Sequence, residues 1–398
     1  MKILSLVLVS SLASLLACTR SASEATPAPP TGPDTVSEID TWPWDSGWLS
    51  TGMNPQEKGR YIVGIGSTPS ALFVLVNYDT LDGPEIPQEL WRTQGGKIWT
   101  RLPLPGQGAT YHSLFRVIGG CLYFSSDDSG VYITDSLGNL IRRIRTPPDF
   151  ISSNYITTID STSQGVVAIL ASRSGPVFQT LVSISDTIMT NLRTKFDVPL
   201  QVSNLVFEAL QGKILVGAEN LYSGDLKSQV AYTYPSSLSY EYWQTNHVSS
   251  IVEYSGKIWT ARNNRVILRL SSENLEYIDS INQFRHSDTF DLQAFSDRRG
   301  QFGGLLKYQD LLFICGQGGG PLDFNGVWVW NEKRLWFQHT PLLRRGIRFN
   351  VANFFPTNGI EVWRDTLYAI TESSRGLLKR AISDIRRDLD RDTARWTP

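Results

Sequence analysis

The feature that most constrains the fold of this chain is a short motif that recurs seven times between residues 70 and 368. Each copy is a turn residue followed by a run of apolar residues, and a second apolar strand-like run follows soon after it. Segments with helical periodicity are nearly absent. Successive copies are 44 to 55 residues apart, and they begin at Ser70, Gly120, Gly165, Gly212, Gly256, Asp310 and Asp365.

A repeat of this length predicts one four-stranded sheet per unit, because the spacing is too long for a turn of a β-helix and matches the period of propeller blades. One twisted sheet cannot bury both of its faces alone, whereas radial stacking between two neighbours covers both. We therefore expect an all-β fold, a seven-bladed β-propeller of four-stranded antiparallel sheets. It forms one domain, residues 42–398.

Closure of the ring is left open by the sequence. Either the segment Trp42–Trp48 or the segment Ala394–Thr397 supplies the outer strand of the last sheet. Trp42, Trp44 and Trp48 lie outside the repeats, so they are either free to stack on a sugar or part of the closure. A ring closed by both termini removes the open edge that invites aggregation.

The N-terminus carries a targeting signal. Residues 1–17 consist of Met1, Lys2 and an apolar run that stops at Cys18, and this run is shorter than the roughly 20 apolar residues of a membrane-spanning helix. The stretch Leu15–Cys18 resembles the bacterial lipobox, which implies cleavage before Cys18 and acylation of its thiol. The alternative is a plain secretory signal peptide.

Residues 18–41 are rich in Pro, Ser and Thr and predict a flexible tether. Acylation of Cys18 with more than one chain would anchor the protein stably to a membrane. We therefore expect an extracytoplasmic protein of the cell envelope, at the outer membrane in preference to the inner one.

Two segments resemble known propeller repeats. Residues 248–261 are similar to the two-component-regulator repeat, although Thr260 and Ala261 stand where that family has Gly-Thr. Residues 92–99 resemble an Asp box, as in sialidase-like propellers, with Gln94 in place of the Asp. Both resemblances imply the same propeller fold.

Charge and cysteine content exclude several classes of function. The chain has 37 basic and 38 acidic side chains, so no net field draws it to nucleic acid. No cluster of His and Cys has the spacing of a metal site, and we expect neither a metal nor a cofactor. A disulfide between Cys121 and Cys315 is possible in an oxidising compartment but not expected, because the two lie in distant repeats.

Three insertions fall on one face of the predicted ring, at residues 77–85, 279–304 and 316–325. Long loops on a rigid scaffold commonly carry binding residues, although such loops can also be solvated decorations. An aromatic ring and both charge signs suit the binding of a protein or glycan partner. The candidate ligand-binding residues are Tyr78, Asp82, Arg298, Arg299, Gln317 and Asp323.

No motif for a nucleophile, a zinc helix or a catalytic triad is present, so catalytic residues stay unassigned. Binding through the loop-bearing face is therefore the expected function, and an enzyme is the less favoured one. The alternatives are a glycan-active enzyme, either a glycosidase or a lyase, and a structural component of the envelope. An enzyme would place acidic and basic side chains facing one another at the centre of the ring.

Overall fold

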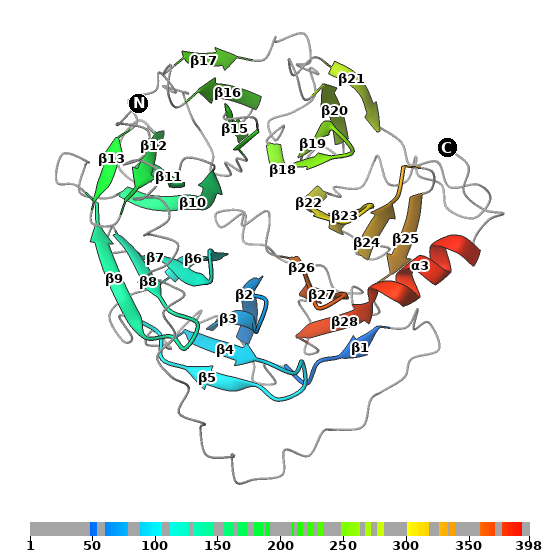
Figure 1. Ribbon diagram of the computed structural model, residues 1–398, viewed down its shortest axis with the longest axis horizontal. Coiled ribbons are helices and arrows are strands. Elements are labelled where there is room, and N and C mark those ends of the chain that lie inside the picture. The colour runs from blue at the N-terminus through cyan, green and yellow to red at the C-terminus, as the bar shows by residue number, and fades with distance from the viewer. Residues whose placement is uncertain are drawn as a thin grey trace, which may run out of the picture.

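The computed structural model shows a β-propeller, with sheets arranged around a common centre (Figure 1). The all-β prediction and the propeller arrangement are confirmed. The structure describes residues 48–53, 60–78, 88–105, 112–126, 130–146, 154–162, 165–172, 179–185, 188–191, 209–210, 213–217, 221–225, 230–233, 248–262, 267–271, 277–281, 301–317, 326–332, 335–339, 359–370 and 376–391.

The described strands form seven four-stranded antiparallel sheets, each named below by its four strands. In chain order, sheet 1 is β2–β5 (Arg60–Ser67, Leu72–Tyr78, Glu89–Thr93, Thr100–Leu102), sheet 2 is β6–β9 (His112–Ile118, Cys121–Ser126, Gly130–Thr134, Leu140–Arg145) and sheet 3 is β10–β13 (Asn154–Thr162, Gly165–Ser172, Gln179–Ile184, Met189–Asn191).

Sheet 4 is β14–β17 (Ala209–Leu210, Lys213–Gly217, Leu221–Asp225, Val230–Thr233), sheet 5 is β18–β21 (Val248–Tyr254, Lys257–Arg262, Ile267–Ser271, Tyr277–Ile281) and sheet 6 is β22–β25 (Gln301–Tyr308, Leu311–Gln317, Gly326–Trp330, Leu335–His339). Sheet 7 is β26–β28 (Ile360–Trp363, Thr366–Ile370, Leu377–Ala381) with β1 (Leu49–Ser50) as its fourth strand.

The apolar motif of each repeat falls in the second strand of a sheet, and the reason is burial on both faces. In β3, Leu72 and Val74 pack in a core shared with sheet 7, whereas Phe73 and Leu75 pack in a core shared with sheet 2. Successive side chains of a strand point to opposite faces. A strand covered on both sides therefore has a continuous apolar run instead of an alternating one.

The ring is closed by the segment around β1. β1 pairs with β28, and the backbone N–H of Thr51 donates to the Leu377 carbonyl at 3.1 Å. Trp48, only 2% exposed, lies in the core between sheets 6 and 7. Of the two closures left open by the sequence, the N-terminal one is present, and Trp48 belongs to it; residues 394–397, with Trp42 and Trp44, lie outside the described part.

One helix was not predicted from the sequence. α3 (Ile382–Arg391) follows β28 directly, and its Ile385 and Leu389 pack in the core between sheets 6 and 7. Figure 1 shows α3 beside β28 and the outer strands of sheet 6. No helix in the described ranges has the length and apolarity to cross a membrane.

Candidate functional site

The predicted binding loops begin at equivalent points of two sheets. Tyr78 is the last residue of β3 and Gln317 is the last residue of β23, so each ends the second strand of its sheet. The backbone of both therefore lies at the end of the sheet opposite the turns between first and second strands. Four candidates lie outside the described residues: Asp82, Arg298, Arg299 and Asp323.

Sheet 7 lies between the two sheets that carry Tyr78 and Gln317, because its first strand β26 contacts both β2 and β22. The two loops thus leave the ring on either side of a single sheet. Convergence of the loops themselves stays a prediction, since residues 79–87 and 318–325 are outside the described part.

A cluster of charged side chains occupies the first strands, which surround the centre of the ring (Figure 1). Three of these residues occupy the same position, in the third residue pair counted from the turn between the first and second strands. They are Arg116 on β6, Asp160 on β10 and Glu361 on β26. The equivalent positions in sheets 5 and 6 are apolar, Val252 and Leu306. We call Arg116, Asp160, Glu361 and the neighbouring Ser67 the axial cluster.

The axial cluster is electrostatically coupled and poorly hydrated. All three ionisable side chains are half-buried, so protein covers most of their surface and water reaches the rest. Burial raises the pKa of Glu361 to about 7, in spite of the Ser67 hydroxyl and the Arg116 guanidinium, which both lower it. Burial likewise raises the pKa of Asp160 and lowers the pKa of Arg116.

Two short hydrogen bonds orient the carboxylates of the axial cluster. The Ser67 hydroxyl donates to Oε1 of Glu361 at 2.6 Å, and the backbone N–H of Ser161 donates to Oδ1 of Asp160 at 2.7 Å. A carboxyl that titrates near neutral pH can take up or release a proton. The arrangement can therefore bind a cation or exchange a proton at the centre of the ring.

At the end of the sheets that carries the turns between first and second strands, hydrogen bonds connect neighbouring sheets. Tyr254, Tyr308 and Trp363 are the last residues of β18, β22 and β26. The Tyr254 hydroxyl donates to the Asp310 carbonyl of sheet 6 at 2.6 Å, and Trp363 Nε1 donates to the Thr68 carbonyl of sheet 1 at 2.9 Å. The Tyr308 hydroxyl donates to the Asp365 carboxylate of sheet 7.

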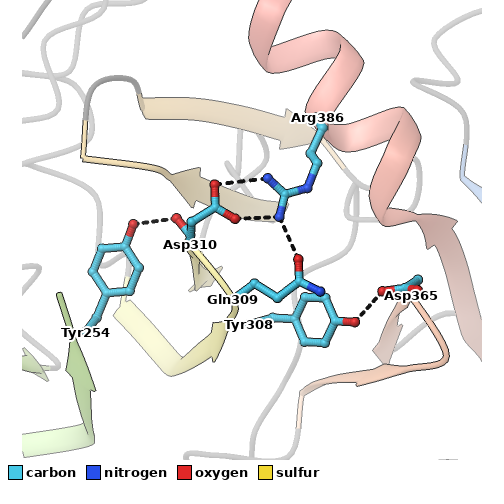
Figure 2. Close-up of polar contacts among 6 residues, drawn as sticks. All are labelled: Tyr254, Tyr308, Gln309, Asp310, Asp365 and Arg386. Carbon is cyan, nitrogen blue, oxygen red and sulfur yellow. Dashed lines mark hydrogen bonds and ion pairs between the residues drawn. The ribbon is translucent and has the colours of Figure 1, made fainter.

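Figure 2 shows how α3 joins this set of contacts. Arg386 donates from Nη1 and Nη2 to the two carboxylate oxygens of Asp310, at 2.9 and 2.5 Å, and from Nη2 to Gln309 at 3.0 Å. Arg386 lowers the pKa of Asp310 by this hydrogen bonding. Burial raises the pKa of Tyr254 to about 12, so its hydroxyl stays protonated and donates. These contacts fasten sheets 5, 6 and 7 together.

The axial cluster was not among the predicted site residues, although the sequence held a signal for it. Aligning the repeats on their turns puts Arg116, Asp160 and Glu361 at one position, where the repeats of sheets 1, 5 and 6 have an aliphatic residue. A charged residue in a buried strand position is the informative exception to an apolar pattern. The repeats are recognisable by their second strands, whereas this position lies on the first strand of each sheet.

The cysteine and metal expectations can be compared with the described residues. Cys315 is a free thiol, so the considered disulfide between Cys121 and Cys315 is not formed. Burial raises the pKa of Cys315 to about 12, which makes this thiol unreactive. Within the described ranges, no group of three or more His, Cys, Asp or Glu residues is arranged to hold a metal.

The comparisons with known proteins bear on the fold alone. No family model matches the sequence, and no curated protein matches it significantly. A chain from the crystal structure of the mitotic checkpoint complex is 12% identical with a TM-score of 0.52, and the match covers 95% of this chain and 98% of the other. YCF48 bound to D1 peptide is 12% identical with a TM-score of 0.51, over 86% and 96% of the two chains. At these identities the similarity establishes a β-propeller.

Proposed function

We propose that this protein is a lipid-anchored, extracytoplasmic propeller that binds a protein or glycan partner through its loop-bearing face. The observation that carries the proposal is the contrast between the two ends of the sheets. The first and second strands are joined by two residues in every sheet but one. Longer connections, such as those after Tyr78 and Gln317, leave from the other end. A rigid scaffold with long loops on one face suits binding there.

The end of the sheets with the short turns supports this assignment, because four of its polar side chains already bind other parts of the protein. Tyr254, Tyr308 and Trp363 each donate to the neighbouring sheet, and Arg386 pairs with Asp310. These contacts hold the sheets in fixed relative positions. Loops on the opposite face would then be presented by a scaffold that loses little conformational freedom on binding.

The solved structure of YCF48 bound to D1 peptide supports a polypeptide as one class of partner, because its similar fold binds a peptide. A glycan stays the other class, since the candidate residues combine an aromatic ring with hydrogen-bonding groups of both charges. Candidates on the loops are Tyr78, Asp82, Arg298, Arg299, Gln317 and Asp323.

The experiment combines a pull-down from native membranes with trimmed loops. Replacing residues 79–87 and 318–325 by tight turns should weaken capture of the partner at least tenfold, while the thermal midpoint stays within about 2 °C. A matched control alters the short-turn end, for example Gln309→Ala. Undiminished capture after trimming both loops and residues 282–300 would reject the loop-bearing face.

Anchoring is tested separately through Cys18. The lipobox-like segment supports acylation of this residue, and β1 places the start of the described chain at the outer edge of sheet 7. Cys18→Ala should release the protein from membranes and leave the propeller folded. Membrane association that survives the substitution, with no acyl chain on the parent protein by intact mass, would contradict the proposal.

A glycan-active enzyme is the second candidate, and the axial cluster is the observation that favours it. Asp160 and Glu361 lie around Arg116, and the pKa of Glu361, raised by burial to about 7, suits a general acid. Hydrolysis of a panel of glycans, lost in both Glu361→Gln and Asp160→Asn, would favour the enzyme over the binding protein.

A further inference from the structure

The large aliphatic side chains that are exposed among the described residues all lie in one part of the ring. They are 41% to 64% exposed. Each lies either in the turn between the third and fourth strands of a sheet or at the start of a fourth strand. We call these residues the apolar rim: Leu49 on sheet 7, Ile98 on sheet 1, Leu137, Leu140 and Ile141 on sheet 2, and Ile188 on sheet 3.

The four sheets that carry the apolar rim follow one another around the ring. β2 of sheet 1 contacts β26 of sheet 7 on one side and β6 of sheet 2 on the other, and β6 contacts β10 of sheet 3. Figure 1 shows their outer strands β1, β5, β9 and β13 in succession along the edge of the molecule. The turn between third and fourth strands lies at the same end of a sheet as the turn between first and second strands. The apolar rim is therefore at the end opposite the long loops.

Hydrogen bonds from the preceding sheet hold two of these outer turns. Lys379 Nζ of sheet 7 donates to the Gly96 carbonyl of sheet 1 at 3.0 Å, and Arg92 Nη1 of sheet 1 donates to the Ser136 carbonyl of sheet 2 at 3.2 Å. Turns are ordinarily built from Gly, Pro, Asn, Asp and Ser. A large aliphatic side chain in the same turn of three successive sheets instead indicates a surface that becomes covered.

Basic side chains follow the apolar rim along β9. Leu140 and Ile141 begin this strand, and Arg142 and Arg143 come next. A strand rises about 3.3 Å per residue, so the two arginines lie about 3 to 10 Å behind the aliphatic pair along the strand. The carboxylate of Asp135, in the preceding turn, accepts hydrogen bonds from two backbone N–H groups of that turn.

This order of residues along β9 fits the surface of a bilayer. Interfacial segments bury their apolar residues roughly 5 to 10 Å into the headgroup region, and long basic side chains then reach the lipid phosphates. Pairing of another protein strand with β9 would cover Leu140 and Ile141. It would leave Ile98 and Ile188 in water, because these lie on other sheets. A flat surface can meet all four sheets at once.

The chain also enters the ring at the apolar rim. Leu49 lies on β1, with which the described sheets begin. About 30 residues separate Cys18 from Leu49, so the two Cα atoms are at most about 110 Å apart. An acyl anchor on Cys18 would therefore keep the apolar rim within reach of the bilayer, where a high effective concentration of lipid makes weak contacts sufficient.

We propose that the apolar rim, together with Arg142 and Arg143, docks on the headgroup region of an anionic bilayer. The aliphatic side chains enter the interface, and the guanidinium groups bind lipid phosphates. The long loops at the other end of the sheets then point away from the membrane, toward the partner. The inference rests on the proposed anchoring in one respect, since the acyl chains supply the attachment and the apolar rim sets the orientation.

The test uses residues 18–398 with Cys18→Ser, a chain that keeps every described residue and cannot be acylated at this position. Flotation measures its binding to phosphatidylcholine vesicles that contain about 30% phosphatidylglycerol. We expect binding that saturates with lipid, weakens as the salt concentration rises, and is at least fivefold weaker on pure phosphatidylcholine. Failure in this assay concerns the apolar rim alone, whereas release of Cys18→Ala from native membranes concerns the anchor.

A triple variant tests the aliphatic side chains. Leu137→Ser, Leu140→Ser and Ile141→Ser together should weaken vesicle binding at least tenfold. All three positions are exposed, so the thermal midpoint should change little. Methionine at the same three positions keeps an apolar surface and is the matched control, for which we expect binding within twofold of the parent.

A double variant tests the basic side chains. Arg142→Gln with Arg143→Gln should weaken binding to the anionic vesicles at least threefold. Lys307→Gln with Arg387→Gln removes as much positive charge from sheet 6 and α3, and should leave binding unchanged. Arg143 lies over the Tyr132 ring at 5.1 Å. Should its replacement lower the thermal midpoint, Arg142→Gln alone decides, with Arg387→Gln as its control.

Four results would overturn the proposal. They are the absence of binding to the anionic vesicles, equal binding to pure phosphatidylcholine, equal binding of the serine and methionine variants, and equal loss in the two charge variants. Light scattering adds a fifth. A dimer that becomes a monomer in the serine variant would show that a second copy of the chain covers the apolar rim in place of a bilayer.

Discussion

At the residue scale, two glycines set the distance between sheets 1 and 2. A Cβ atom built on Gly66 would lie 2.7 Å from Val117 Cγ2, and one on Gly64 would lie 3.1 Å from Phe115 Cδ1. Gly66→Ala should therefore destabilise the protein by about 1–3 kcal/mol, because overpacking forces the sheets apart. Urea unfolding measures the difference.

Gly95→Ala is the matched control for this change, since a Cβ there would meet no atom within 4 Å. Its effect should stay within about 0.5 kcal/mol. Combining Gly66→Ala with Val117→Ala should recover part of the loss, because the second change removes the clashing methyl groups. No recovery in the double variant would show that the close approach is not the cause.

Glu361 gives the stability a pH dependence that can be measured. Its pKa is raised by burial from an ordinary value of 4.5 to about 7 in the folded protein, so the fold favours the protonated carboxyl. The folded state then binds more protons than the unfolded chain between these values, and stability falls as the pH rises through this window. Between pH 5 and pH 8 the parent should lose more stability than Glu361→Gln. Parallel pH profiles of the two proteins would contradict the raised pKa.

At the scale of elements, α3 is held by its apolar face more than by its ion pair. Ile385 is fully buried between sheets 6 and 7, whereas Arg386 and Asp310 are 35% and 64% exposed. Ile385→Ala should cost about 2–5 kcal/mol by leaving a cavity. Arg386→Ala should cost less than about 1 kcal/mol, because exposed ion pairs contribute little. Urea unfolding compares them, and the reverse order would show that the contacts in Figure 2 hold the helix.

Elements with a strong local signal were predictable from the sequence. Each apolar run lies in a second strand, because burial on both faces leaves an uninterrupted pattern, as in β3 and β23. The spacing of Ile382, Ile385 and Leu389 carried the helical period of α3, but this short segment follows the β28 strand directly. Neither the length of this segment nor the repeat pattern indicated a helix.

The candidate site was less predictable, since it depends on contacts between sheets. Arg116, Asp160 and Glu361 are 44 or more residues apart, and only ring closure brings their first strands around one centre. The loop candidates rested on insertion length, a signal that indicates where variation is tolerated but not which side chain binds. Of these candidates, the structure locates the backbone of Tyr78 and Gln317.

At the scale of the whole molecule, the N-terminal segment and the last sheet make one closure. Trp48 fills the core between sheets 6 and 7, β1 pairs with β28, and Trp99 of sheet 1 donates from Nε1 to the Thr51 carbonyl at 3.1 Å. The segment thus contacts sheets at both sides of the seam. Its contacts with sheet 7 span more than 300 residues of sequence, so it joins the two ends of the described chain.

Removal of residues 1–53 should therefore destabilise the entire ring more than removal of residues 1–47 does. The longer deletion takes away Trp48 and β1 and exposes the edge of β28, which invites pairing with another molecule. Compared with the shorter deletion, we expect it to lower the thermal midpoint by several degrees and to produce dimers or aggregates in light scattering. Equal midpoints and equal molecular mass for both deletions would show that the ring is stable without its N-terminal strand.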